Sequence, residues 1–518
     1  MNAERAQRPW WPVAYPIVLV IAFLVLLLVS SGASFFAGTR MILVGAVLAT
    51  LLTVVAGTLM RDRHRGGLVA LAVVLLILTG TQPAIFAALV AGIVLLVVER
   101  LASLRQPSRT PWPVLTRALN AIAVVVVIAV AIKGVQEGAF RGFVDDVANE
   151  GPAFLRSDRP ADASNPTDPD IYVLLLDGYA RDDKLLDLFG YDNGPFLAEL
   201  RSRGFDISSG SRSNYLLTAV SLSSALNMRQ LTGETSLAAL PVGNAQQVRE
   251  ARHLINGNAV FHELHARGYE TIGLASGFEE VALRNADRFV DTGQINEVEF
   301  AFFRQTLAGS IMETVDPDYF ADEQRARIDS LFSEVAKVAA EPHDRPRFVF
   351  VHVPSPHAPI VYGADGSHVA ARDLATFYGD RAAALGVTQK EYGDRYTGQI
   401  AYLNRHTLDT IDALVASFKR PTALIVMSDH GSASGFRPED LVGSDLDERS
   451  ANLLAARTPD HPKVFGDSIS LVNVFGTLFD AYFGTHHPHQ PDTVYRWEGA
   501  SIFNLVPVEG IAPGGREP

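Results

Sequence analysis

Long apolar runs dominate the first quarter of the chain. Residues 11–31 and 41–60 contain no charged side chain, and each run is long enough as a helix to cross roughly 30 Å of hydrocarbon. A third run, 66–98, is too long for one straight span, and Gly80-Thr81-Gln82-Pro83 interrupts it where a tight hairpin is expected. A last run covers 118–132. The pattern predicts five membrane-spanning helices, and a cleaved signal peptide would explain only the first.

Arginine positions predict how these helices are oriented. The arginines fall in three clusters, which precede the first span, separate the second from the third and separate the fourth from the fifth: Arg5 and Arg8; Arg61, Arg63 and Arg65; Arg100, Arg105, Arg109 and Arg117. If the N-terminus lies on the cytoplasmic side of a bacterial-type cytoplasmic membrane, all three clusters lie on that side too, and everything after about residue 134 lies on the outer side. No Asp, Glu or Lys lies within a span, which favours an anchor over an ion path. A lipid-handling surface remains the alternative.

A different pattern follows a linker. Residues 157–170 are rich in Pro, Asp and Ser, which is typical of a linker. Short apolar runs then recur, and helical stretches separate them: strands at 170–177, 271–275, 347–353 and 422–427, and helices at 193–203, 259–267, 322–340, 396–418 and 468–483. The alternation predicts a mostly parallel α/β sheet flanked by helices.

The predicted domain order is therefore a transmembrane region over 1–134, a linker over 135–170, an extracytoplasmic domain over 171–508 and a flexible tail over 509–518.

Composition excludes several classes of function. The net charge is −13; residues 1–150 hold 12 basic and 7 acidic side chains, so the remainder holds 32 basic and 50 acidic ones, a net of −18. A body this acidic repels a phosphate backbone, so we do not expect nucleic-acid binding. The chain has no cysteine, which excludes disulfides, thiolate catalysis and Cys-ligated zinc or iron–sulfur centres.

Candidate metal ligands follow two of the predicted strands. Asp177 ends the first, and Asp429-His430 directly follow the last. In parallel sheets, ligands bind outside the carboxyl ends of the strands, and carboxylate oxygen with imidazole nitrogen suits a divalent cation. Ordinary turn chemistry at Asp177 and a solvated turn at 429–430 remain the alternatives.

Hydroxyl residues crowd between Ser211 and Ser224, ahead of a helix expected to begin near Ala225. A hydroxyl at a helix N-terminus faces free backbone N–H groups that can hold a phosphoryl group. The alternative is that Thr218 or Ser221 is only an N-cap. His352 and His357 lie beside three prolines at a strand exit, and their alternative is a pair of surface histidines.

Taken in chain order, these elements resemble the alkaline phosphatase superfamily, specifically its membrane-bound sulfatase-like branch, which includes lipoteichoic acid synthases and phosphoethanolamine transferases. Thr218-Ala-Val-Ser-Leu is similar to the nucleophile segment of the transferases, Ser428-Asp-His-Gly matches the late metal motif, and His352-Val-Pro-Ser-Pro-His-Ala-Pro resembles the mid-chain histidine motif. The resemblance covers roughly residues 171–483.

The resemblance implies roles for individual residues. Asp177, Thr218, Asp429 and His430 would hold one divalent cation, whether Zn, Mn, Mg or Ca. Thr218 would also be the nucleophile, forming a phospho-threonine, and His357 would contact the substrate or protonate the leaving group. His352 and Asn214 are assigned to substrate binding.

Departures from the family narrow the expected activity. Type I sulfatases convert a Cys or Ser within C/S-x-P/A-x-R to formylglycine, and neither residue occurs here in that spacing. The Gly-Glu that usually follows SDHG is also missing, so the later histidine of the family's site has two candidates here, His461 and the run 486–489.

The sequence therefore predicts a membrane-anchored, metal-dependent phosphoryl or phospho-alcohol transferase, or a hydrolase of similar esters, acting on envelope lipids or glycans. The alternatives are a sulfatase-like hydrolase of soluble esters and a non-catalytic envelope-binding protein.

Overall fold

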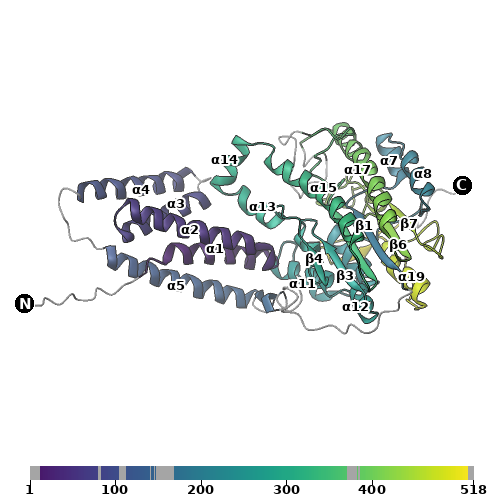
Figure 1. Ribbon diagram of the computed structural model, residues 1–518, viewed down its shortest axis with the longest axis horizontal. Helices are drawn as coiled ribbons and strands as arrows, with labels where there is room; N and C mark the ends of the chain where they lie inside the picture. The colour runs from purple at the N-terminus through teal and green to yellow at the C-terminus, as the bar shows by residue number, and fades with distance from the viewer. Residues whose placement is uncertain are drawn as a thin grey trace, which may run out of the picture. The chain divides into compact units, whose positions relative to one another are not determined.

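The computed structural model describes residues 12–79, 83–103, 112–139, 142–144, 146, 168–369, 382 and 386–511 (Figure 1). The chain folds into two compact units. One comprises Met1–Val144 together with Val298–Asp316, and the other comprises Asp145–Glu297 together with Pro317–Pro518. Most of the predicted linker and tail lies outside the described residues.

The first unit is a helical bundle. Helices occupy all five predicted positions: α1 (Tyr15–Ser31), α2 (Thr39–Leu59) after a short 3₁₀ turn η1 (Phe36–Gly38), α3 (Arg63–Thr79), α4 (Pro83–Ser103) and α5 (Trp112–Gln136). Within the described residues, two stretches, Phe36–Leu59 and Trp112–Gln136, are long and apolar enough to cross a membrane, each with a mean hydropathy of 2.4. The region thus has two clear apolar spans, and the total of five membrane spans remains a prediction. The predicted hairpin at 80–82 lies outside the described residues.

Apolar side chains cover the outside of this bundle. Leu43 and Val47 of α2 and Val125 of α5 are exposed, whereas a water-soluble surface rarely shows contiguous apolar residues. The sequence did not predict two further helices of this unit, α13 (Glu297–Arg304) and α14 (Leu307–Val315). Their chain segment lies between strands of the second unit in the sequence.

The second unit is built on a seven-stranded sheet of order β2-β7-β6-β1-β5-β3-β4. Strands β6, β1, β5, β3 and β4 run parallel, while β7 is antiparallel to β6 and to β2. The bounds are β1 (Asp170–Leu176), β2 (Asp206–Ile207), β3 (Glu270–Leu274), β4 (Arg288–Val290), β5 (Arg347–Val353), β6 (Thr422–Met427) and β7 (Leu454–Arg457). The mostly parallel α/β domain is confirmed, with strands at the four predicted positions. The sequence missed β2, β4 and β7, which are short.

Helices cover both faces of the sheet, so β1 is buried on both sides. Tyr172, Leu174 and Leu176 pack into one core, and the alternate residues Ile171 and Val173 pack into the other. The first core is covered by α7 (Asp182–Phe189), α8 (Gly194–Ser202), α15 (Tyr319–Ala340) and α17 (Gln389–Ser417), and the second by α9 (Thr218–Asn227), α12 (Ala259–Ala266) and α19 (Leu471–Phe483). The smaller elements are α10 (Thr235–Ala238), α11 (Ala245–Asn256), η3 (Glu279–Val281), α18 (Leu446–Ser450), β8 (Tyr495–Trp497) and β9 (Leu505–Pro507).

Two helix starts differ from the prediction for local reasons. Helix α17 begins at Gln389, well before the expected residue 396, because Thr388 and Glu391 form a reciprocal capping box. The expectation of a helix starting near Ala225 is wrong, because α9 begins at Thr218. Ser221, Ser223 and Ser224 are therefore inside the helix and buried.

His487 joins the loop after α19 to α12. Its Nδ1 lies 2.7 Å from Asp480 Oδ1, and its Nε2 lies 3.0 Å from Glu263 Oε2. Burial lowers the pKa of His487, but the hydrogen bonds to the two carboxylates raise the pKa by more than burial lowers it, so the net shift is upward. His487, one histidine of the run 486–489 that was a candidate for a later histidine contact, is thus held between Asp480 and Glu263.

We expect His487→Gln to lower the apparent Tm at about pH 5.5 and to have a smaller effect at about pH 8.5. A histidine with a raised pKa stabilises the fold fully below its unfolded pKa of about 6.5, and the contribution is lost as pH rises through the folded pKa. The side chain is partly exposed, so the loss should stay below about 1 kcal/mol. Thermal unfolding of the full chain in detergent measures this, with exposed His489→Gln as the control; an equal loss at both pH values would contradict the charge argument.

Candidate active site

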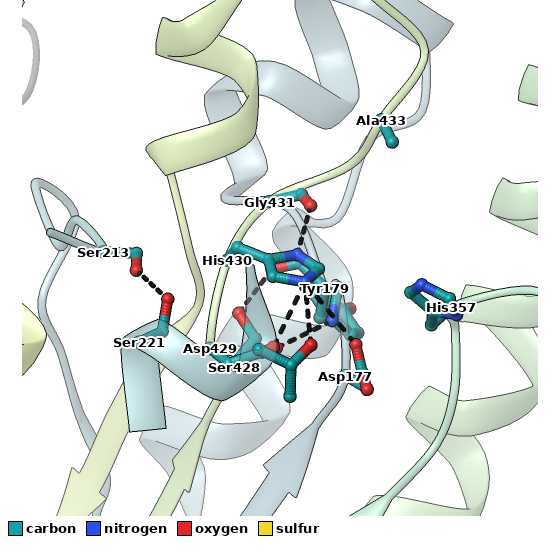
Figure 2. Close-up of polar contacts among 12 residues, drawn as sticks. Asp177, Tyr179, Ser213, Ser221, His357, Ser428, Asp429, His430, Gly431 and Ala433 are labelled. Atoms are coloured by element: carbon teal, nitrogen blue, oxygen red, sulfur yellow. Dashed lines mark hydrogen bonds and ion pairs between the residues drawn. The ribbon is translucent and has the colours of Figure 1, made fainter. Parts of the chain in front are cut away.

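The candidate ligands meet at one edge of the sheet because β1 and β6 are parallel neighbours. Asp177 directly follows β1, and Asp429 and His430 follow β6. Figure 2 shows these side chains converging, with the first turn of α9 beneath them. All three are buried, and one potential ligand atom from each lies within 4.8 Å of the others. Among the described residues, this is the one such group of three ligands.

Short distances link this group to Thr218. The Nε2 atom of His430 lies 3.2 Å from Asp429 Oδ2, 3.7 Å from Asp177 Oδ1 and 3.2 Å from Thr218 Oγ1. The four residues that the sequence assigned to a metal are therefore in one place, with the hydroxyl against the imidazole.

The donor set fits a divalent cation. Asp177 Oδ1 and Asp429 Oδ2 are buried and have no hydrogen-bond partner in the described part of the chain, which is costly for a carboxylate oxygen. The other oxygen of each group is held: His352 Nε2 donates to Asp177 Oδ2 at 2.9 Å, and the Gly178 N–H donates to Asp429 Oδ1 at 3.0 Å. The two unsatisfied oxygens are the ones that face His430.

The tautomer of His430 is set by its other nitrogen. Nδ1 lies 2.9 Å from the Gly431 carbonyl, which can only accept, so Nδ1 carries the proton and Nε2 presents its lone pair to the cluster. Burial, then the charge of Arg449, hold the pKa of His430 well below its usual value. A neutral imidazole is the form that binds a metal.

The two carboxyl groups are pushed in opposite directions. Burial raises the pKa of Asp177, but His357, His352 and His430 more than reverse this and hold it below its usual range. Burial and the nearby charge of Asp177 raise the pKa of Asp429 to about 6. A cation between the two oxygens would take the place of that proton.

Thr218 is the first residue of α9. The N-cap is Leu217, in extended backbone, and no side chain caps the helix, so the alternative that Thr218 or Ser221 is an N-cap is wrong. Thr218 and Ala219 line a cavity of about 250 Å³. The hydroxyl therefore stands at the positive end of the helix, where first-turn N–H groups are available to an anion.

Ser221 and Asn214 serve the scaffold. The Ser221 hydroxyl lies 2.9 Å from the hydroxyl of Ser213 and donates to the Tyr215 carbonyl, away from the cluster. The Asn214 side chain donates to the Thr493 carbonyl and accepts from the Val472 N–H. Asn214 is buried and does not line the cavity, although it was predicted to bind substrate.

The two candidate histidines differ in position. His357 lines the cavity, and its ring centre lies 6.3 Å from that of His430 (Figure 2). Its Nδ1 lies 2.7 Å from the Ala358 carbonyl, which can only accept, so Nδ1 carries a proton. His352 is buried behind Asp177 and bonded to it; there it positions the carboxylate.

Arg449, at the end of α18, also lines the cavity and was missed by the sequence reading. Its Nε donates to the Leu216 carbonyl at 2.9 Å and its Nη1 to the Gly431 carbonyl at 3.3 Å, while Nη2 lies 3.0 Å from His430 Nε2. The guanidinium thus bridges the entry to α9 and the turn that carries His430. Its five-residue helix gives no periodic signal, so position in the fold was needed to find it.

Comparison with known proteins adds the family. The Sulfatase family model matches residues 169–485, more than half of the 518 residues. The chain belongs to the Sulfatase family. This confirms the resemblance predicted from the four motifs and the prediction of an enzyme with sulfatase-like ester chemistry.

Solved structures similar to this sulfatase-family chain are distant. The integral membrane lipooligosaccharide phosphoethanolamine transferase A from Neisseria meningitidis is 13% identical, with 90% of this chain and 95% of that chain covered and a TM-score of 0.38. The C-terminal periplasmic domain of EcEptC from Escherichia coli, in complex with Zn, is 13% identical, with 67% and 89% covered and a TM-score of 0.39. The phosphonate monoester hydrolase of Agrobacterium radiobacter is 13% identical, with 63% and 79% covered and a TM-score of 0.36. No curated protein matches the chain. Membership of the sulfatase family therefore rests on the family-model match.

We expect Asp429→Asn to weaken binding of a divalent metal by at least about 100-fold, because an amide oxygen carries no charge to balance the cation. Elemental analysis of the purified full chain and the metal-induced shift in Tm measure this. Asp412→Asn is the matched control, since that carboxylate lies on the exposed face of α17. Equal metal content in all three proteins would exclude Asp429 as a ligand.

Proposed function

We propose that the protein is a membrane-anchored, metal-dependent phosphoryl or phospho-alcohol transferase, or a hydrolase of such esters, that acts on envelope lipids or glycans through a covalent phospho-threonine. The observation that carries the proposal is the position of the Thr218 hydroxyl, 3.2 Å from His430 Nε2, beside two unsatisfied carboxylate oxygens and open to the cavity. A binding protein needs neither this nucleophile nor these ligands.

Asp177, Asp429, His430 and the Thr218 hydroxyl would hold one divalent cation, which lowers the pKa of a bound hydroxyl and neutralises phosphoryl oxygens. In the first step, the Thr218 hydroxyl loses its proton to water in the cavity, and Oγ1 forms a bond to phosphorus while the bond from phosphorus to the leaving alcohol breaks. The first turn of α9 and Arg449 both line the cavity, so the N–H groups of that turn and the guanidinium are the proposed donors to the transferring group. His357 Nε2 supplies the proton to the leaving oxygen.

The second step reverses these roles. The oxygen of an acceptor alcohol or of water forms a bond to phosphorus and gives its proton to His357 Nε2. The bond from phosphorus to Thr218 Oγ1 breaks, and the released Thr218 oxygen regains a proton from water. An alcohol makes the protein a transferase and water makes it a hydrolase. Sulfuric ester hydrolysis is disfavoured, because no cysteine is present and no serine has the formylglycine spacing.

The proposed placement is multi-pass in a bacterial-type cytoplasmic membrane, with residues 171–508 as the catalytic domain outside the cytoplasm. It is supported by the apolar exterior of α2 and α5 and by the arginine clusters between the predicted spans. A site outside that membrane meets envelope lipids and glycans, hence the proposed substrates.

We expect Thr218→Ala to abolish turnover, by about 10³-fold or more, since the proposed route needs a bond between Thr218 Oγ1 and phosphorus. The full chain in detergent is incubated with phospholipid labelled in the headgroup, and label on the protein is located by mass spectrometry. Label should sit on Thr218 and pass to an added acceptor if the protein is a transferase.

Ser221→Ala is the matched control, because it removes a hydroxyl one turn along the same helix and should keep most of the activity. Loss of turnover in Ser221→Ala, with full activity in Thr218→Ala, would move the nucleophile. No turnover and no label with any phosphoric ester would favour the envelope-binding alternative.

We expect Arg449→Ala to reduce kcat by about 10²–10³-fold, the range for removing one preorganised donor to a developing anion, with metal content retained. Arg449→Lys keeps the charge but loses the planar fork, so it should recover only part of the rate. The exposed Arg437→Ala on the same connection is the control. A change confined to KM, or parallel loss of metal and rate, would contradict a role at the transferring group.

A further inference from the structure

Helices α13 and α14 form a short hairpin that packs on the helical bundle. Glu299 of α13 makes a two-pronged ion pair with Arg40 at the start of α2, the one charge in the predicted outer connections. Val298 and Phe302 join the apolar cluster formed by α1, α2 and α3. Helix α14 packs along α3 (Figure 1).

The contacts of α13 reach well along the first predicted span. The ring of Phe302 lies 6.4 Å from that of Phe23, centre to centre. Phe23 is eight residues before Ser31, the last residue of α1, which is roughly 12 Å along the helix axis at 1.5 Å per residue. If α1 spans the membrane, Phe302 lies inside the hydrocarbon layer and not above it.

Helix α14 carries an apolar stripe, and two of its three side chains are exposed in the part of the chain that the structure describes. Leu307, Ile311 and Val315 are spaced four residues apart and so share one face. Ile311 is 53% exposed and Val315 is 77% exposed. The charged Glu313 points elsewhere and pairs with Arg304 at 2.8 Å.

The turn between the two helices is tight, which fixes the hairpin. Thr306 caps α14 by accepting from the Gly309 N–H at 3.1 Å. A Cβ atom at Gly309 would lie 2.1 Å from the Phe303 carbonyl oxygen, so a glycine is required there. The direction of the apolar stripe is therefore set by the fold.

We propose that α13 and α14 are a lipid-embedded hairpin, with the face of Leu307, Ile311 and Val315 in contact with acyl chains of the leaflet in which residues 32–38 lie. The partner is the acyl region of a bilayer, because α14 packs on α3 of a bundle whose α2 also exposes apolar side chains, Leu43 and Val47. The hairpin would be a second membrane attachment, in addition to the N-terminal spans. The chain leads directly into it from Glu297, which lines the catalytic cavity.

Single thiols test this cleanly, because the natural chain has no cysteine. Ile311→Cys and Val315→Cys are labelled with bimane in the full chain, reconstituted in phosphatidylcholine vesicles with and without brominated acyl chains. Leu43→Cys on α2 is the lipid-facing reference. Val442→Cys, 83% exposed in the second unit, is the water-facing reference, and Glu313→Cys probes the opposite side of α14.

The expected result is blue-shifted emission and loss of fluorescence in brominated vesicles for labels at 311 and 315, as at 43, with the label at 313 close to that at 442. Labels at 311 and 315 that behave like the one at 442 would overturn the proposal. So would equal quenching at 311, 313 and 315, which would mean that α14 has no defined lipid face. The measurement needs no turnover, so its outcome is independent of the proposed enzymatic function.

Discussion

The repulsion between two buried carboxylates governs this site. Asp177 and Asp429 each turn one oxygen without a hydrogen-bond partner toward His430, and such an arrangement is stable only if positive charge lies between them. Two hydrogen bonds keep the groups in that position: His352 holds the far oxygen of Asp177, and the Gly178 N–H holds the far oxygen of Asp429. In the proposed reaction, Thr218 would depend on a cation that meets this charge requirement beside it.

The sheet brings the two carboxylates together, and the helices place Thr218 and Arg449 beside them. Parallel pairing of β1 with β6 brings Asp177 to the turn at 428–431, although they are far apart in the sequence. Helix α9 then packs on the same core as β1, which fixes the height of Thr218 against the turn. Arg449 ties the two parts together through the carbonyls of Leu216 and Gly431. A displacement of the start of α9 would therefore also move the turn at 428–431, and the reverse holds too.

The sequence predicted what depends on local pattern and on motif. Buried strands such as 347–353 read as continuous apolar runs, and Asp177, Thr218, Asp429 and His430 stood at strand ends or beside a helix. It could not predict Arg449, whose position depends on a five-residue helix, or the use of Asn214 as a brace between distant loops. It also did not separate α13 and α14 from the second unit, because membership of a unit depends on contacts such as Phe302 with Phe23, which no local window contains.

The place of Thr218 at the first position of a helix has an entropic consequence. A β-branched side chain in helical backbone is restricted to two χ1 rotamers, so the oxygen has few directions in which to point before it reacts. A serine there would keep the oxygen but gain rotational freedom that has to be lost again on the way to the transition state. In the proposed reaction, the methyl group of the threonine, which takes no part in bond making, would thus help to aim the attack.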